Sequence, residues 1–512
     1  TPCQISVTSL DSGESFFPRF CIKYKYPFPF FFSFTGSAVL NLPEGTYQVE
    51  AIRGFRTEIA RAMVFLLGEG ERNITLKLYE PLDMAGRNWY CGDHHIHLFG
   101  HFSTIYPMLN FNSLVEMSRA VGLDYVPYST PYLQYKKRNK REYKFSGDII
   151  AEITMEMASY VWGHFCTLGV SKPVKDVPQV FYIYPTIYES LRQVIRNGGA
   201  IVGAHPAQIL QIPHNTVYET KDLSCYTGDH RRWNLCKVLP LLLLSGIPCG
   251  YDLIIADGYG TQKMFTREYY KLLNFGFKIS ACGSTDCNVD ISNSRNPLGS
   301  CRTYVYADTF SMKDIAKGYI KGHTFATNGP LILLKVKEHM PGDTLFVEKG
   351  EKINIDVHVF SAFGLSFAEI IFNGEPVFRK ELTGHNELKF SFELKIEKHG
   401  WLAGIVRGPG NRWINSWPIP PEERRTLGQF AHTTPVYVRI QGERFKPSHE
   451  LVNYYHRWLT NMKKLPEGWK ELLIEDAKRS GITPEEAKRH IIRWIETGLK
   501  KIEKIASEGW EE

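Results

Sequence analysis

Hydrophobic and polar residues alternate one by one in four short stretches, two near the start of the chain and two after residue 350. These stretches are residues 46–51, 74–78, 353–359 and 388–394. A period of two is typical of a β-strand with one buried face. Asn373-Gly374 lies between the last two stretches and predicts a hairpin turn. We therefore expect one β-sandwich-like module over residues 1–80 and a second over residues 331–440.

Residues 81–330 follow a different pattern, in which a segment of helical periodicity, a glycine and a short apolar strand recur. The units span residues 113–128, 188–204, 241–257, 266–282 and 311–328. Helices that alternate with buried strands are typical of a parallel α/β barrel rather than a sandwich. In such a barrel the residues that follow the strands gather at one face, where the chemistry takes place.

The last part of the chain, residues 441–512, has the pattern of a helical tail. Thr483 and Pro484 have the residue types of a helix N-cap and first turn. The apolar residues that follow form one stripe, made of Ile491, Ile495, Leu499 and Ile502. Such a stripe docks either on the chain's own barrel or on a partner, and self-docking is the more ordinary outcome.

Composition limits the class of protein. Of 512 residues, 43% are hydrophobic and 13% aromatic, which is enough to build several cores. The net charge of +7 is diffuse, so no nucleic-acid partner is expected. The longest apolar run, residues 238–247, is too short to span a membrane. Because the chain begins at Thr1 without methionine, we expect a processed start and favour a secreted or extracytoplasmic protein of unknown oligomeric state.

All ten cysteines lie within the first 301 residues, and their spacing is not that of a zinc ribbon. Cys166, Cys249 and Cys282 fall in predicted strands, where cysteine acts as a small apolar side chain. Cys3 and Cys21 form a disulfide only if the compartment is oxidising.

The run Gly92-Asp93-His94-His95-Ile96-His97 contains the strongest chemical signal. In an extended segment the side chains of His95 and His97 point to the same side and suit one metal ion. His94 then points away. Asp93 lies on the opposite face from the ligands, where we expect it to orient them.

Four further candidate ligands stand where short apolar runs end: Glu152, His164, His205 and Asp286. A carboxylate such as Glu152 in an apolar run needs a metal or another strong partner. His164 beside Trp162 has the alternative interpretation of a core histidine, and Asp286 that of a helix cap. A histidine followed by proline at a strand end, as at His205, is difficult to explain by packing alone.

Taken in order, these motifs resemble the PHP superfamily, named for polymerase and histidinol phosphatase, and more closely its CehA/McbA branch of metallohydrolases. The matching motifs are Gly92 to His97, Gly163-His164, Gly203-Ala204-His205-Pro206, Ser284-Thr285-Asp286 and Thr327-Asn328-Gly329-Pro330. The resemblance implies a distorted (β/α)7 barrel over residues 81–330 with up to three metal ions at its mouth.

The resemblance also implies a ligand set. His95, His97 and Asp286 belong to the first ion, His164 and His205 to the second, and Glu152 bridges them. The third site is degenerate, because Ser129-Thr130-Pro131 replaces Thr-Asp-His and Asp286-Cys287-Asn288 replaces Asp-x-His. We therefore expect one or two divalent ions, Zn, Mn or Fe.

This centre predicts a hydrolase that uses a metal-bound hydroxide to cleave a phosphoester, carbamate or similar ester. Glu152 and Asp93 are the predicted catalytic residues. The predicted substrate-binding residues are His101, Tyr128, Tyr132, Arg302 and Asn328. Two alternatives stay open: a secreted carbohydrate-active metal-dependent enzyme, and a non-catalytic binding protein that kept a degenerate barrel. The expected ligand is a small molecule or a carbohydrate.

Overall fold

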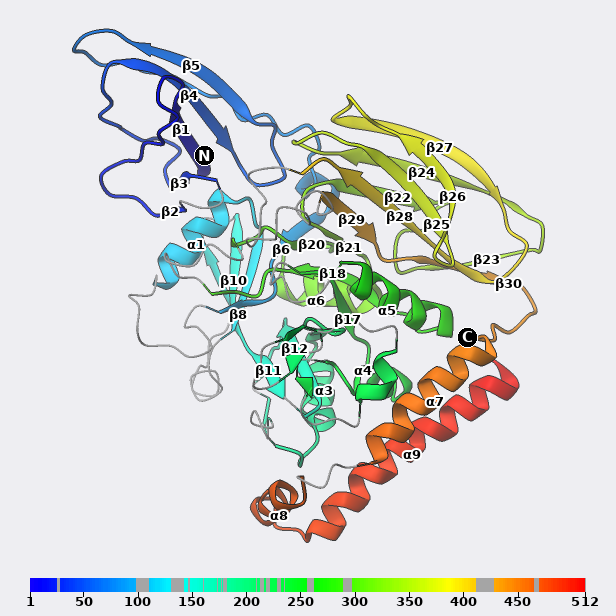
Figure 1. Ribbon diagram of the computed structural model, residues 1–512. Coiled ribbons are helices and arrows are strands. Elements are labelled where there is room, and N and C mark those ends of the chain that lie inside the picture. The colour runs from blue at the N-terminus through cyan, green and yellow to red at the C-terminus, as the bar shows by residue number, and fades with distance from the viewer. Residues whose placement is uncertain are drawn as a thin grey trace.

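The chain is a mixed α/β protein in this computed structural model. The structure describes residues 1–24, 28–97, 110–129, 142–145, 148–159, 161–172, 174–175, 177, 182–208, 210–211, 216–217, 222–227, 232–233, 235–255, 262–288, 297–410, 428–464 and 469–511. An N-terminal sheet, a central α/β region, two packed C-terminal sheets and a group of C-terminal helices follow one another along the chain (Figure 1).

The N-terminal residues form one antiparallel sheet in the order β2-β3-β1-β4-β5. Its strands are β1 (Cys3–Ser9), β2 (Lys23–Tyr24), β3 (Phe30–Ser33), β4 (Gly45–Ile52) and β5 (Ala60–Leu66). The alternation at 46–51 does form a strand, β4, with Tyr47 buried. Residues 74–78 form none, and Ile74 is 46% exposed, because no neighbouring strand pairs with this backbone among the described residues. A single sheet therefore stands where a sandwich was predicted.

Strands of the central region fall into two sheets. The first contains β6 (Trp89–Gly92), β7 (Ile96–His97), β8 (Tyr125–Ser129), β9 (Glu142–Phe145), β10 (Ile149–Thr154), β19 (Cys287–Asn288), β20 (Arg302–Tyr306) and β21 (Thr324–Thr327). The second contains β11 (Glu156–Ser159), β12 (Gly163–Leu168), β13 (Ala200–Gly203), β17 (Gly250–Ile255) and β18 (Ser280–Ser284). β7, β8 and β10 run parallel in the first sheet, and β13, β17 and β18 run parallel in the second. β19 follows β18 and pairs with β7, so the chain returns to its first parallel strands.

The described strands do not close into one hydrogen-bonded barrel. β12 runs antiparallel to both of its neighbours, β11 and β13, which interrupts the predicted parallel order. β10 and β12 lie next to each other but belong to different sheets. Side chains bridge this seam, since Oγ1 of Thr154 lies 2.8 Å from Oγ1 of Thr167. The predicted α/β class is confirmed, whereas the predicted distorted (β/α)7 barrel is not.

Described helices lie between some of the successive strands of this region. They are α1 (Phe111–Ala120), α3 (Ile187–Arg196), α4 (Leu239–Leu244), α5 (Gln262–Phe275) and α6 (Met312–Lys321). α1 begins at Phe111, before the start predicted with Ser113 as its N-cap, because the side chain of Asn110 caps the helix by accepting from Ser113 N–H. Short elements complete the region: η1 (Ala85–Arg87), η2 (Leu223–Tyr226), β14 (Leu210–Gln211), β15 (Thr216–Val217) and β16 (Arg232–Trp233).

Two sheets after residue 330 pack face to face. One contains β22 (Leu331–Val336), β24 (Lys352–Phe360) and β27 (Glu387–Lys395). The other contains β23 (Thr344–Val347), β25 (Phe367–Phe372), β26 (Glu375–Glu381), β28 (Gly400–Gly408), β29 (Gln429–Thr433) and β30 (Val436–Ile440). The Asn373-Gly374 turn joins β25 to β26, and both residues have positive φ. β29 also pairs with β21, so this second sheet continues into the central region.

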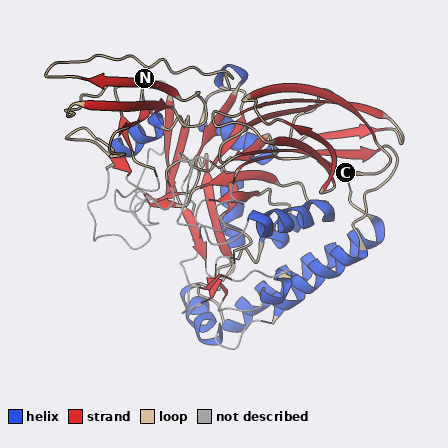
Figure 2. Cartoon of the chain, turned by 45° about the horizontal axis from the view of Figure 1, so that its top comes forward, coloured by secondary structure: helices blue, strands red, loops and turns tan. Residues whose placement is uncertain are grey.

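The C-terminal helices are α7 (His449–Lys463), α8 (Trp469–Arg479) and α9 (Pro484–Glu508). Thr483 and Glu486 form a capping box at the start of α9. Ile491, Ile495 and Ile502 are fully buried, and Trp494 Nε1 donates to Ser245 Oγ beyond α4. The apolar stripe therefore docks on the chain's own central region. Figure 2 shows the long C-terminal helices in blue, apart from the red strands of the C-terminal sheets.

No described helix has the length and apolar character needed to cross a membrane. The cysteines of the described residues are all free thiols, Cys3 and Cys21 included. Cys166, Cys249 and Cys282 are buried, as expected of small apolar side chains.

Candidate metal centre

Two histidines at the start of the central region reach the same carboxylate. His95 precedes β7 and His97 ends it, and their Nε2 atoms lie 3.2 and 3.1 Å from Oδ1 of Asp286. Both imidazoles are buried. The ligand atoms of these three residues lie within 4.8 Å of one another, close enough to hold one ion. The two histidines share one face of the chain, as the sequence predicts.

Glu156, the first residue of β11, joins these residues to the other histidines. Its Oε1 lies 2.8 Å from Nδ1 of His164 and 3.5 Å from Nε2 of His95. The same oxygen is 3.8 Å from Nε2 of His205, and Oε2 is 3.5 Å from Nε2 of His97. His95, Glu156 and His205 form a second group that has the spacing of a metal site. We call the six residues the histidine–carboxylate cluster: His95, His97, Glu156, His164, His205 and Asp286.

The structure does not bring Glu152, the predicted bridging and catalytic carboxylate, into this cluster. Its two carboxylate oxygens accept hydrogen bonds from the backbone N–H groups of Gly169 and Val170, at 2.8 and 3.1 Å. Glu152 is buried in the middle of β10, and its side chain joins this strand to the backbone that follows β12. We correct the assignment to Glu156 on this geometry.

Glu156 has the same position relative to its strand as two other cluster residues, although the sequence does not mark where that strand ends. β10 continues through Thr154, so its carboxyl end lies after that residue and not at Glu152. Glu156 is the first carboxylate beyond the end of the strand. It therefore has the same relation to its strand as His205 has to β13 and Asp286 has to β18.

The backbone is strained at two of the cluster residues. His205 has φ of +35° and Asp286 has φ of +53°, in the left-handed region that few non-glycine residues adopt. Each lies two residues beyond the end of a strand, β13 or β18. Such conformations concentrate at functional sites, where the surrounding structure holds them.

The donor atoms of the cluster fit a metal better than a set of direct hydrogen bonds. Nε2 of His95 and Oε1 of Glu156 are both buried, yet the 3.5 Å between them is too long for a good direct hydrogen bond. Two donors that each lie about 2.1 Å from one tetrahedral ion are about 3.4 Å from each other. Four imidazoles and two carboxylates are a set that suits Zn, Mn or Fe.

Electrostatics couples the imidazoles to the carboxylates. Burial opposes protonation of His95, but Asp286 and Glu156 together raise the pKa of its imidazole well above the usual value. Burial alone favours the neutral form of Glu156, yet the charges of His95 and His164 hold its pKa well below the usual value. The carboxylate of Glu156 is therefore ionised at neutral pH, which is the form that binds a cation.

Asp93, the second predicted catalytic residue, lies beside the cluster and not in it. It is fully buried, and its carboxylate accepts from the backbone N–H groups of Thr285 and Gly299, both at 3.1 Å. Thr285 directly precedes the cluster residue Asp286. This geometry supports a positioning role for Asp93.

His94 points away from the cluster, as predicted. Its Nε2 lies 3.0 Å from Oδ1 of Asp252, and Oδ2 of Asp252 accepts from Ser284 Oγ at 2.7 Å. All three side chains are fully buried. This network ties β17 and β18 to the segment that carries His95.

The predicted substrate-binding residues are only partly described. His101 and Tyr132 lie outside the described residues. Tyr128 is buried in β8 and its ring packs against Phe111, with centroids 5.2 Å apart. The Asn328 side chain accepts from Phe430 N–H at 2.6 Å and so joins the end of β21 to β29. Asn328 therefore has a structural partner.

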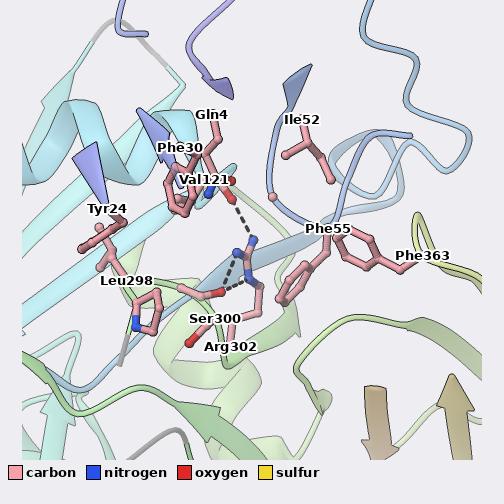
Figure 3. Close-up of a pocket in the computed structure, with 13 residues that line it drawn as sticks. Gln4, Tyr24, Phe30, Ile52, Phe55, Val121, Leu298, Ser300, Arg302 and Phe363 are labelled. Carbon is pink, nitrogen blue, oxygen red and sulfur yellow. Dashed lines mark hydrogen bonds between the residues drawn. The ribbon is translucent and has the colours of Figure 1, made fainter. Parts of the chain in front are cut away.

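Arg302 does not reach the cluster either. It lines a pocket between the N-terminal sheet and the central region (Figure 3). Its guanidinium donates to the carbonyl of Gly299 from Nε and Nη2, at 2.8 and 2.6 Å, and to the carbonyl of Val121 from Nη1 at 3.0 Å. The charged group also stacks on Phe55, 4.1 Å from the ring centroid. These contacts give Arg302 a role in joining the two regions.

Cys287 has no feature of a nucleophile. Burial raises the pKa of its thiol well above the usual value, and the nearby charge of Asp93 acts in the same direction. The reactive form of cysteine is the thiolate, which this environment disfavours.

No family model and no curated protein matches the chain. One similar solved structure, from Bacteroides vulgatus, is a two-domain protein containing a predicted PHP-like metal-dependent phosphoesterase. The match covers 62% of this chain and 90% of that chain, with 12% sequence identity and a TM-score of 0.31. Another is Endonuclease Q in complex with a 27-mer duplex substrate that has an abasic lesion at the active site. This match covers 46% of this chain and 57% of that chain, with 16% sequence identity and a TM-score of 0.29. Likeness at these TM-scores establishes neither a family nor an activity for the chain.

Proposed function

We propose that this chain is a metal-dependent hydrolase whose centre is the histidine–carboxylate cluster. The main observation is the position of Glu156, whose carboxylate lies within 3.8 Å of a ring nitrogen of each of the four cluster histidines. A carboxylate with this reach suits the bridging position between two ions. His95, His97 and Asp286 would hold one ion, and His164 and His205 the other, with Glu156 shared.

The metal ions would supply Lewis acidity, which lowers the pKa of water and stabilises charge on a leaving oxygen. Two divalent ions bring four positive charges, and Glu156 and Asp286 return two negative ones. The centre would therefore be net positive and favour an anionic ligand. Asp93 holds the Asp286 segment in place, and the four imidazoles would bind as neutral ligands.

This charge balance favours a phosphoester, a carbamate or a similar ester as substrate. The sequence motifs support placement in the PHP superfamily and its CehA/McbA branch, and the third site of that family remains degenerate by residue type. Cleavage of a carbohydrate and a purely non-catalytic binding role are the two competing functions.

Metal analysis of protein purified without chelators tests the proposal. We expect one to two equivalents of Zn, Mn or Fe per chain. If the wild type binds two ions, the double variant His164→Ala/His205→Ala should lose at least one of them. His385→Ala, at an exposed histidine of the C-terminal sheets, is the matched control and keeps the wild-type content. Wild-type protein without metal would leave only the binding role.

A substrate screen separates the remaining functions. Metal-loaded protein is assayed with phosphate monoesters and diesters, carbamates and glycosides. Turnover of a phosphoester or carbamate, lost in the double variant, supports the proposal. Turnover of glycosides alone would favour the carbohydrate function, and full metal content without any turnover would favour binding.

A further inference from the structure

Ser129 is the last residue of β8, at the carboxyl end where the cluster lies. In the sheet it pairs with His97 of β7 on one side and with Thr154 of β10 on the other. All three strands run parallel at these pairs. Ser129 therefore occupies the position between a cluster histidine and the strand that leads to Glu156.

The register fixes the side to which the Ser129 side chain points. Laterally paired residues of parallel strands have their side chains on the same face of the sheet, and the strands are about 4.8 Å apart. The imidazole of His97 points to the cluster, since its Nε2 is 3.1 Å from Oδ1 of Asp286. The hydroxyl of Ser129 therefore points to the same side as His97 and lies next to it.

This hydroxyl differs from that of its neighbour Thr154, because none of the described residues is its hydrogen-bond partner. Ser129 is 6% exposed, and its Oγ forms no hydrogen bond with any residue that the structure describes. On the other side of the same row, Oγ1 of Thr154 lies 2.8 Å from Oγ1 of Thr167. A buried hydroxyl to which the described residues offer no partner is unfavourable in the folded protein, and it is available to a bound ligand.

We propose that Ser129 is a substrate-binding residue whose hydroxyl donates a hydrogen bond to a non-bridging oxygen of a phosphoester. This inference rests on the proposed function and narrows its substrate class. A hydroxyl adds no charge of its own, so it leaves the positive balance of the centre unchanged. It supplies a donor on the side of His97, whereas the other hydroxyl of this row, that of Thr154, already lies 2.8 Å from Oγ1 of Thr167.

Binding of inorganic phosphate to the zinc-loaded protein tests the assignment. Isothermal titration calorimetry gives the Kd, and elemental analysis of the same samples gives the metal content. In Ser129→Ala we expect a Kd for phosphate about tenfold weaker than that of the wild type, because one hydrogen bond to a charged oxygen is lost. The metal content of this variant stays at the wild-type value, since Ser129 is not a ligand.

Two further variants control for packing. Ser118→Ala removes another fully buried serine hydroxyl, which donates to Leu114 O at 2.8 Å within α1, and should bind phosphate like the wild type. Ser129→Thr keeps a hydroxyl on a residue that favours strands, and its Kd should stay within about twofold of the wild type. This variant keeps the test decisive if Ser129→Ala folds poorly.

The outcomes separate this inference from the proposed function. Wild-type affinity for phosphate in Ser129→Ala overturns the inference and leaves the metal centre standing. Loss of metal from that variant also overturns it, because Ser129 would then act on the ions. Wild-type protein that holds zinc but does not bind phosphate again overturns the inference alone, whereas wild-type protein that holds no metal overturns both.

Discussion

Thr285 binds both carboxylate oxygens of Asp93: its backbone N–H donates to Oδ1 at 3.1 Å, and its hydroxyl donates to Oδ2 at 2.5 Å. Asp93 lies two residues before His95, and Thr285 lies one residue before Asp286. The pair therefore fixes the distance between two ligands that come from segments far apart in the sequence. Burial raises the pKa of Asp93, and the hydrogen bonds from Thr285 act against this rise.

Asp93→Asn should weaken metal binding by about 10- to 100-fold, as is usual when a residue that orients ligands is changed. The amide has one acceptor atom and would turn its NH2 group toward a donor. A chelator competition assay measures the affinity. Asp314→Asn, at the start of α6, is the control and should bind metal like the wild type. Unchanged metal affinity in Asp93→Asn would contradict the positioning role of the Asp93 carboxylate.

Glu156→Gln and Glu152→Gln should have opposite effects. We expect Glu156→Gln to lose at least half of its bound metal, because its carboxylate lies among the cluster histidines. Glu152→Gln should keep its metal but lose about 1–3 kcal/mol of stability, because one backbone N–H beyond β12 would face an amide NH2 group. Elemental analysis and thermal unfolding of both variants check this. The reverse pattern would restore Glu152 as the ligand.

The sequence led to five of the six cluster residues and missed the sixth for a physical reason. His95, His97, His205 and Asp286 each stand at a strand end that a glycine or a sharp turn makes visible in the sequence. The end of β10 is not marked in this way, because the apolar run stops at Ile153 while the strand continues to Thr154. The apolar run also does not reveal that backbone N–H groups are the partners of the Glu152 carboxylate, so it suggests a metal where none is needed.

Other parts of the fold depend on contacts that a local pattern does not contain. Residues 74–78 have the alternation of a strand, but a strand also requires a neighbour, and none pairs with them among the described residues. The direction of β12 is likewise set by its pairing with β11 and β13. The helix starting at Pro484 was predictable because its capping box and apolar stripe are local.

Gly54→Ala should destabilise the protein much more than Gly13→Ala does. Both glycines have positive φ, +57° and +74°, which costs an alanine about 1–2 kcal/mol. A Cβ at Gly54 would also lie 1.9 Å from the carbonyl oxygen of Val121, whereas Gly13 has open space around it. Overpacking of this kind adds about 1–3 kcal/mol. Differential scanning calorimetry should show the larger fall in Tm for Gly54→Ala, and equal falls would contradict the close contact.

His432 should make the protein less stable in mild acid. Burial lowers the pKa of its imidazole from 6.5 to about 4, with Arg407 acting in the same direction. Because the folded pKa lies below the unfolded value, the stabilising contribution is complete above pH 6.5 and is lost as the pH falls toward 4. The loss reaches about 3 kcal/mol at the lower end.

The variant His432→Gln isolates this effect, because glutamine does not titrate in the range. Unfolding is followed between pH 6.5 and 4 in metal-free protein, so that metal release does not contribute. The wild type should lose stability more steeply than the variant over this window. Parallel curves for the two proteins would mean that His432 keeps an ordinary pKa in the fold.

The antiparallel pairing of β21 with β29 makes the region after residue 330 a structural part of the central sheet. A protein truncated after residue 330 would lose β29, so β21 (Thr324–Thr327) would become an edge strand with unpaired backbone groups. Exposed edge strands promote aggregation. The smallest version suitable for expression and crystallisation should therefore extend at least through β30.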